Sequence, residues 1–167
     1  YGDHRDLHLS LRRQRQMCIR DRSNEGNSFS SLEISESLQT GILSTDVDFL
    51  KYNFESKRDL ENNLASHNLN LSLVYNSKQS RNYHSFSFCD QWNNCAESSE
   101  IKVVSVSGSN CKNNNCDYKE VFQVQLTDEF LKNTINDGFS MRLISDSKTN
   151  KIEIPKAYLM GYLKVAQ

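Results

Sequence analysis

Glycine and proline are scarce in this chain, which has six glycines and one proline among 167 residues. Loops that bind phosphates or dinucleotides depend on clustered glycines, and no such fingerprint occurs. The chain also lacks an HExxH zinc pair and a nucleophile elbow. Its longest apolar run, residues 157–163, is far shorter than the roughly 20 residues of a membrane span. No catalytic motif, cofactor site or membrane helix is therefore predicted.

The first 22 residues differ in composition from the rest of the chain. They contain six Arg and no Lys, whereas residues 23–167 contain eleven Lys and three Arg. The run RRQRQMCIRDR is similar to a translated sequencing adapter, so we interpret residues 1–22 as a non-native leader. The alternative is a basic arm for nucleic acid. The segment lacks the features of a signal peptide, so we expect the native start, with any signal peptide or lipoprotein cysteine, to be missing.

Residues 23–167 are acidic and polar in composition. Residues 23–167 carry 14 Lys and Arg against 18 Asp and Glu, a formal charge of −4. A nucleic-acid-binding domain would show a basic face, so this class is not expected. Residues 46–167 are long enough for one domain with its own core. Residues 23–45 are rich in Ser and Glu and predict a flexible tether, although spaced Leu and Ile residues leave an edge strand or a short helix open.

Four cysteines remain once Cys18 is set aside with the leader. They are Cys89, Cys95, Cys111 and Cys116. An even count in a polar single domain predicts two disulfides and an oxidising compartment. The local pairs Cys89–Cys95 and Cys111–Cys116 each flank a short polar loop, so we favour this connectivity. Free thiols and a four-cysteine zinc site are the alternatives, although the intervals are wider than the two-residue knuckles of most structural zinc sites.

Alternating apolar and polar residues predict a mainly β domain over residues 46–167. The alternating segments are 47–54, 69–75, 82–89, 101–106, 117–126, 139–144 and 151–154. We expect the second and third of these to form a hairpin, and residues 107–110 to turn. Thr127 predicts the N-cap of a helix over about 128–136 that ends before Gly138, and Pro155 starts a final helical segment. The predicted fold is an antiparallel β-sandwich-like domain with one or two short helices near the C-terminus.

Three residues are candidates for binding or catalysis. Trp92 lies between two cysteines, where it is either an exposed binding anchor or a plug for the end of the sandwich. Glu120 shares a strand face with four apolar residues, so its carboxylate must be paired, protonated or near the sheet end. We expect a structural pairing, for example with Lys or Arg, and an acid–base role is the alternative. His84 lies on an aromatic strand face, where we expect a packed or edge histidine rather than a titrating group.

Three further polar residues are assigned to the surface. Asp46 and Asp48 begin the strand 47–54 without the glycine-centred loop of a calcium site, which indicates a solvated strand end. His67 has no neighbouring Cys or second His in the sequence. We therefore expect its side chain to lie on the surface.

A set of residues in the last third of the chain follows a family pattern: a Cys, an aromatic–x–Glu, a helix, a Gly-led strand and an iP-x-x-Y segment. The matching residues are Cys116, Tyr118, Glu120, Leu126 to Leu131, Gly138, Ile152, Ile154, Pro155, Tyr158, Gly161 and Leu163. In these residues the chain resembles the C-terminal part of an uncharacterised group of bacterial secreted proteins and predicted lipoproteins. The resemblance implies an envelope location and a compact β-rich domain. It supplies no activity and no site residues.

The sequence favours a non-enzymatic protein of the bacterial cell envelope, periplasmic, lipoprotein-type or secreted. Its partner is expected to be an envelope protein or a surface ligand, with no nucleic acid involved, and with membrane attachment only through a missing N-terminal anchor. The first alternative is an enzyme with dispersed acid and base residues centred on Glu120, in a pocket shared with a partner such as His84. The second is an intracellular zinc-bound adaptor.

Overall fold

The computed structural model describes residues 18–23, 26–39, 47–59, 61, 64–90 and 92–166, with the backbone alone for 18–23, 26, 27 and 39. The strands are β1 (Cys18–Ser23), β2 (Gly26–Ser31), β3 (Ile34–Gln39), β4 (Val47–Arg58), β5 (Ala65–Ser77), β6 (Ser85–Cys89), β7 (Ser99–Glu100), β8 (Lys102–Lys112), β9 (Asn115–Leu126), β10 (Phe139–Ile144) and β11 (Thr149–Ile154). The helices are α2 (Asp128–Thr134) and α3 (Lys156–Ala166). No helix of these ranges is long and apolar enough to cross a membrane.

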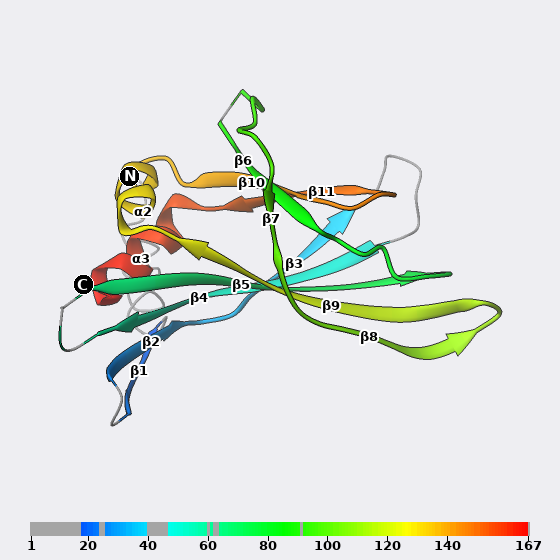
Figure 1. The fold of residues 1–167 in the computed structure, drawn as a ribbon, viewed down its shortest axis with the longest axis horizontal. Helices are drawn as coiled ribbons and strands as arrows, with labels where there is room; N and C mark the ends of the chain where they lie inside the picture. The colour runs from blue at the N-terminus through cyan, green and yellow to red at the C-terminus, as the bar shows by residue number, and fades with distance from the viewer. Residues whose placement is uncertain are drawn as a thin grey trace, which may run out of the picture.

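The strands form two antiparallel sheets (Figure 1). The larger sheet has the order β1-β2-β4-β5-β9-β8, with β3 also paired to β4. The smaller sheet has the order β11-β10-β6-β7. The predicted antiparallel, sandwich-like fold with helices near the C-terminus is therefore confirmed.

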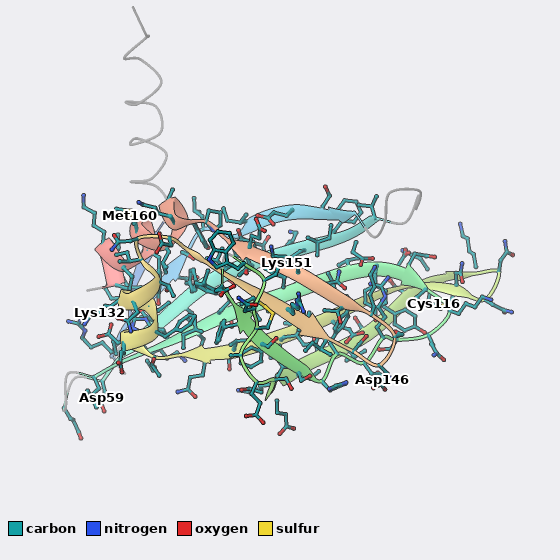
Figure 2. All side chains as sticks on the ribbon, turned by 90° about the horizontal axis from the view of Figure 1, so that it is seen from above. Asp59, Cys116, Lys132, Asp146, Lys151 and Met160 are labelled. Carbon is teal, nitrogen blue, oxygen red and sulfur yellow. A yellow bond between two sulfur atoms is a disulfide. The ribbon has the colours of Figure 1, made fainter. Side chains whose placement is uncertain are left out.

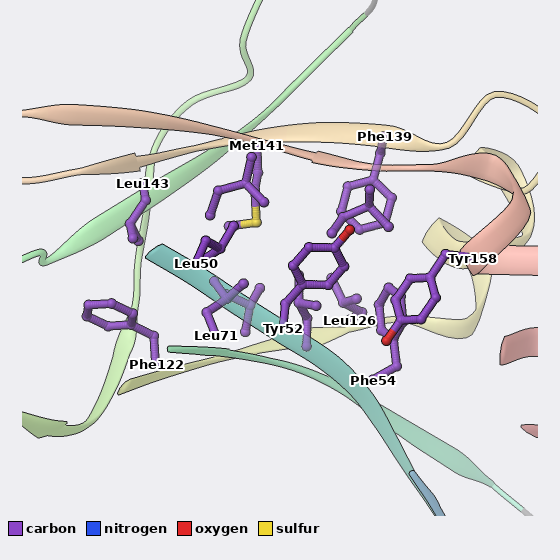
Figure 3. Close-up of a cluster of buried hydrophobic side chains, with 14 of the residues drawn as sticks. Leu50, Tyr52, Phe54, Leu71, Phe122, Leu126, Phe139, Met141, Leu143 and Tyr158 are labelled. Atoms are coloured by element: carbon purple, nitrogen blue, oxygen red, sulfur yellow. The ribbon is translucent and has the colours of Figure 1, made fainter. Parts of the chain in front are cut away.

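The core lies between the two sheets. Every second residue of β4, β5 and β9 points inward, because side chains alternate along a strand. Figure 3 shows the contact: Leu50, Tyr52 and Phe54 of β4 lie below Phe139, Met141 and Leu143 of β10, and Tyr158 of α3 packs beside Phe54. Helix α3 thus covers one end of the sandwich with the apolar side that its spacing predicts.

The strands β2 and β3 pair in succession with the same edge of β4. Residues 26–39 therefore belong to the sheet rather than to a flexible tether, as the edge-strand alternative allowed. Between β2 and β3 the chain bulges, and the hydroxyl of Ser31 accepts the backbone N–H of Phe54 at 2.8 Å. Tyr158 donates to the carbonyl of Leu32 at 2.7 Å. Side chains replace the ladder bonds that the bulge removes, which the local sequence did not predict.

The predicted hairpin between residues 69–75 and 82–89 is wrong, because β6 does not pair with β5. It pairs with β10 and β7 in the smaller sheet rather than with β5. The loop of residues 78–84 therefore carries the chain from one sheet to the other. Tyr83 is buried in this loop, whereas His84 is exposed. The sequence pattern could not choose between sheets, because a strand of this length fits either.

The hairpin of β8 and β9 extends beyond the smaller sheet (Figure 1). Residues 107–110, predicted as a turn, lie in β8, and the turn falls at Asn113 and Asn114 instead. Both have positive φ, 51° and 65°, which asparagine tolerates better than most residues. The Cys111–Cys116 disulfide, with an S–S distance of 2.01 Å, spans this turn.

The helix signals of the sequence are confirmed with one shift of boundary. The hydroxyl of Thr127 accepts the backbone N–H of Phe130 at 3.1 Å, which makes it the N-cap of α2. Gly138 has a φ of 75°, the left-handed conformation expected after a helix. The helix ends at Thr134, two residues earlier than predicted, and α3 follows Pro155 directly.

Candidate functional site

Glu120 lies on the inner face of β9, opposite Leu73 of β5, and is fully buried. Its carboxylate accepts hydrogen bonds from the hydroxyls of Tyr75 and Ser80, the latter at 3.1 Å. The backbone N–H groups of Asn82 and Tyr83 donate to it at 3.3 Å each. The expectation that Glu120 is paired within the fold is confirmed. Its donors, however, are hydroxyls and backbone amides rather than a Lys or Arg. The loop that changes sheets therefore wraps around this carboxylate.

Asp48 occupies a similar buried position near the start of β4 and is 1% exposed. Arg81 donates to both carboxylate oxygens, at 2.6 and 3.0 Å. Lys148 donates at 2.7 Å and Asn150 at 3.1 Å. Burial alone would raise the pKa of Asp48, but the hydrogen bonds from Arg81, Lys148 and Asn150 outweigh it and lower the pKa. The prediction of a solvated strand end is wrong for Asp48, while Asp46 lies outside the described residues.

Arg81 connects the two buried carboxylates. Its guanidinium binds Asp48 and lies 3.9 Å from the centre of the Tyr75 ring, a cation–π contact. Its backbone N–H donates to the Tyr75 hydroxyl at 2.8 Å, and that hydroxyl donates to Glu120. Tyr75 and Tyr83 both have a raised pKa, mainly through burial, with the pKa of Tyr83 at about 12. Both phenols are therefore neutral donors at physiological pH.

A surface hollow of about 460 Å³ lies above this network. It is lined by Ser77, Lys78, Gln79, Ser80, Arg81, Ser147 and Lys148. Three of these side chains are cationic, and none is acidic. The hollow is at the end of the molecule that carries Asp146, opposite the end that carries Met160 in Figure 2. Two segments far apart in the sequence, the loop between β5 and β6 and the turn between β10 and β11, therefore form a polar and basic concavity.

Trp92 projects from a separate loop and is 77% exposed. The loop is closed by the Cys89–Cys95 disulfide, with an S–S distance of 2.02 Å. The Asp90 carboxylate accepts the backbone N–H groups of Trp92 and Asn94, both at 2.8 Å. The alternative in which Trp92 plugs the sandwich is therefore wrong. The ring is an exposed aromatic group on a braced loop, as the binding-anchor alternative requires.

His84 does not join Glu120. Its ring is 54% exposed, and Nε2 lies 3.3 Å from the carboxylate of Asp146. The adjacent residue Tyr83 is buried and contacts Glu120 through its backbone. His84 is therefore exposed rather than packed, and its backbone bonds Ile144 on one side and Ile101 on the other, so it is not at a sheet edge. The structure does not bring together the pair that an acid–base hypothesis would need.

His67, expected on the surface, is 2% exposed. Its Nδ1 lies 2.7 Å from the Tyr162 hydroxyl, and Nε2 lies 3.6 Å from a carboxylate oxygen of Asp128. Burial lowers the pKa of His67, and Asp128 opposes this effect in part. The expectation failed because β5 begins at Ala65, earlier than the alternation indicated, and its inner face includes position 67.

The four cysteines pair as predicted, Cys89 with Cys95 and Cys111 with Cys116. A disulfide sulfur is not the thiolate that a zinc site needs, so these residues do not form one in this structure. No group of three or more His, Cys, Asp or Glu residues within the described ranges is arranged to hold a metal ion. The disulfides fit a protein of a non-cytoplasmic compartment.

Sequence reasoning missed the residues that form the hollow. Lys78, Arg81 and Lys148 lie in turns whose residue types predict loops but not where the loops meet. One signal was present: only three Arg follow residue 22, and Arg is the side chain best suited to a buried pair with a carboxylate. The scarcity of Arg does not show which carboxylate Arg81 binds, because that depends on the fold.

Searches of protein-family models, curated proteins and solved structures found no match to the chain.

Proposed function

We propose that this protein is a non-catalytic binding domain of the cell envelope or the extracellular space, and that it takes a small anionic group in the hollow above Asp48. The observation that carries the proposal is the lining: Lys78, Arg81 and Lys148 face one concavity with no acidic side chain in it. A carboxylate, phosphate or sulfate group is the complementary ligand chemistry.

The buried network supports the binding proposal because it holds two of the cations in place. Arg81 and Lys148 both bind the Asp48 carboxylate, at 2.6 and 2.7 Å, so their side chains are held beside the hollow. A fixed cation loses less side-chain entropy when it binds a ligand than a free one does. Burial of Asp48 and Glu120 costs free energy that an apolar core would not cost, which favours a role beyond stability.

The compartment is inferred from the cysteines. Two disulfides persist in oxidising environments such as the periplasm or the extracellular space. The resemblance to bacterial secreted proteins and predicted lipoproteins agrees with this placement. Trp92 is a second candidate contact for a larger envelope partner, because its ring is exposed and Trp is enriched among binding hot spots.

The test is an NMR titration of the ¹⁵N-labelled protein with inorganic phosphate and, separately, with acetate, at constant ionic strength set by chloride. We expect amide shifts confined to residues 77–81 and 147–148. The phosphate and acetate arms distinguish a phosphate-type ligand from a carboxylate-type ligand. Lys78→Ala should weaken binding about tenfold, since one charge-assisted hydrogen bond is lost.

The matched control is Lys156→Ala, which removes the same charge from an exposed lysine at the start of α3, in the helix that covers the other end of the sandwich. It should leave the titration unchanged. Shifts spread over the whole surface, or an equal loss of binding in both variants, would show general charge screening and contradict a built site. An absence of shifts would contradict the proposal outright.

A second candidate function is an acid–base enzyme. One observation favours it: Ser80 both lines the hollow and donates to Glu120. Against it, Glu120 is fully buried and four donors already engage its carboxylate. The discriminating experiment is a hydrolase screen of the protein and of Glu120→Gln. Turnover that the substitution abolishes would replace the binding proposal with a catalytic one.

A further inference from the structure

The hollow lined by residues 77–81 and 147–148 is larger than the anionic group that binds there in the proposed function. Its volume of about 460 Å³ lies within the range of sites for small organic molecules, roughly 300–1,000 Å³. A lone carboxylate or phosphate group would leave most of this space to water. The hollow therefore has room for a larger molecule that carries the anionic group and contacts the lining with its remaining atoms.

The lining favours a polar body for that molecule. Among the described residues, no aromatic or aliphatic side chain lines the hollow. Nucleotides and apolar acids do not fit, because their sites bury the base or the chain against aromatic or aliphatic side chains. An amine does not fit either, because Lys78, Arg81 and Lys148 would repel an ammonium group. The four other lining residues are neutral and polar: Ser77, Gln79, Ser80 and Ser147.

Three consecutive residues of the lining keep their hydrogen-bonding groups available to a ligand. The side chains of Ser77, Lys78 and Gln79 form no hydrogen bond or ion pair within the ranges that the structure describes. Ser147 adds a hydroxyl from the turn between β10 and β11, 3.5 Å from the hydroxyl of Ser145. Ser and Gln side chains both donate and accept, as the hydroxyls of a sugar do. Neighbouring ring hydroxyls of a sugar are therefore suitable partners for this lining.

Lys78 differs from the other two cations of the hollow. Arg81 and Lys148 both bind Asp48, at 2.6 and 2.7 Å. Lys78 has no carboxylate partner among the described residues, and it is exposed. Because one cation of the three lacks a partner, the hollow suits a ligand with one acid group better than a polyanion.

We propose that the ligand is a sugar acid, a single sugar ring that carries one carboxylate or phosphate group. This inference rests on the proposed function, because it requires the same hollow to bind anions. The acid group binds Lys78. Ring hydroxyls bond Ser77, Gln79 and Ser147, so the ring bridges the loop between β5 and β6 and the turn between β10 and β11.

NMR titrations of the ¹⁵N-labelled full chain with glucuronate, glucose 6-phosphate, acetate and glucose test the proposal at constant pH and ionic strength. Acetate keeps an acid group without the ring, and glucose keeps the ring without the acid group. The better of the two sugar acids should bind about tenfold or more tightly than acetate or glucose, because ring hydrogen bonds add to the ion pair. The comparison of glucuronate with glucose 6-phosphate shows which acid group the hollow prefers.

The outcomes separate this proposal from the function on which it rests. If acetate binds in the hollow as tightly as both sugar acids, the sugar ring is not recognised, and only the anion site stands. If glucose binds as tightly as both sugar acids, the acid group is not recognised, and the proposal is overturned. If none of the four compounds shifts the amides of residues 77–81 and 147–148, both proposals fail.

Gln79→Ala tests the contact with the ring. It should weaken binding of the preferred sugar acid about fivefold, because one neutral hydrogen bond is lost, and it should leave acetate binding unchanged. Gln125→Ala is the matched control, since it removes the same amide from an exposed position of β9 outside the hollow. It should change neither titration. The amide spectra of both variants also show directly that they are folded.

Two results with Gln79→Ala would contradict the proposed ring contact. An equal loss for acetate and the sugar acid would place Gln79 at the acid group instead of the ring. An unchanged affinity for the sugar acid would show that Gln79 does not bond the ligand. Either result would overturn the arrangement in which the ring lies against the loop between β5 and β6.

Discussion

Arg81 binds both carboxylate oxygens of Asp48, at 2.6 and 3.0 Å, in a site where Asp48 is 1% exposed. The two residues are 33 positions apart in the sequence. Their contact holds the loop of residues 78–84 against β4. Arg81 also links Glu120 to the same network through Tyr75. Stability and the candidate site therefore depend on the same group of side chains.

Replacement of Asp48 by Ala should be strongly destabilising, because it leaves Arg81 and Lys148 without their carboxylate. The expected loss is about 3–5 kcal/mol of unfolding free energy, as for other broken buried pairs. Urea unfolding followed by far-UV circular dichroism measures it. Trp92 fluorescence is a poor probe, since the ring is already exposed in the folded protein.

An exposed ion pair in the same chain supplies the control. Lys51 and Glu33 lie 2.7 Å apart, with side chains 52% and 51% exposed. Glu33→Ala should cost less than about 1 kcal/mol, because water screens the pair. If the two variants lose similar amounts, burial is not what makes the Asp48 contact important.

Stability should fall in mildly acidic solution because of His67. Burial lowers its pKa in the folded state below the ordinary value of 6.5. Between the two values the unfolded chain binds more protons than the folded one, so the unfolding free energy decreases as the pH falls below 6.5. Above 6.5 this contribution is fully present. Urea unfolding at a series of pH values measures the slope.

His67→Gln should reduce the slope below pH 6.5, because glutamine can bond Tyr162 without titrating. His84→Gln, a change at a ring that is 54% exposed, is the matched control and should retain the slope of the unmodified protein. Equal slopes in all three proteins would assign the acid sensitivity to other groups.

Gly138→Ala should destabilise the fold by about 1–3 kcal/mol from backbone strain alone. The residue has a φ of 75°, and a Cβ atom there would lie 2.4 Å from the carbonyl oxygen of Ile154. Thermal unfolding provides the measurement. Gly161→Ala in α3, which has no positive φ, should be neutral or stabilising. A neutral Gly138→Ala would contradict the tight approach between this turn and β11.

Thiol alkylation with intact-mass analysis tests the compartment. The cysteines Cys89, Cys95, Cys111 and Cys116 should react only after reduction, because each is in a disulfide. The test is most informative on protein purified from its natural source in the presence of the alkylating reagent. Alkylation of all four without reduction would remove the basis for an envelope location and reopen the intracellular alternative.

Much of the fold followed from local pattern. The alternation at Leu50, Tyr52 and Phe54 predicted a strand with one buried face, and it has one. Thr127 predicted the start of a helix and is its N-cap, and Gly138 has the left-handed conformation predicted for it, although the helix ends at Thr134. Each of these signals acts over a few residues, so the sequence nearby contains all of the information.

The candidate site was less predictable. Glu120 was identified because a carboxylate on an apolar face needs donors, but the donors lie 37 to 45 residues away in the chain. Asp48 and His67 were assigned to the surface because nothing near them in sequence suggested a partner. Their burial depends on which strands become neighbours.

By itself, the sequence determined the strand faces, the helix cap, the glycine turn and the local cysteine pairs, since each rests on short-range geometry. The tertiary structure decided which sheet holds β6, where β2 and β3 pair, and how Asp48, Arg81 and Lys148 meet. Those outcomes depend on long-range contacts, whose free energy comes from burial and pairing between segments that no local pattern relates.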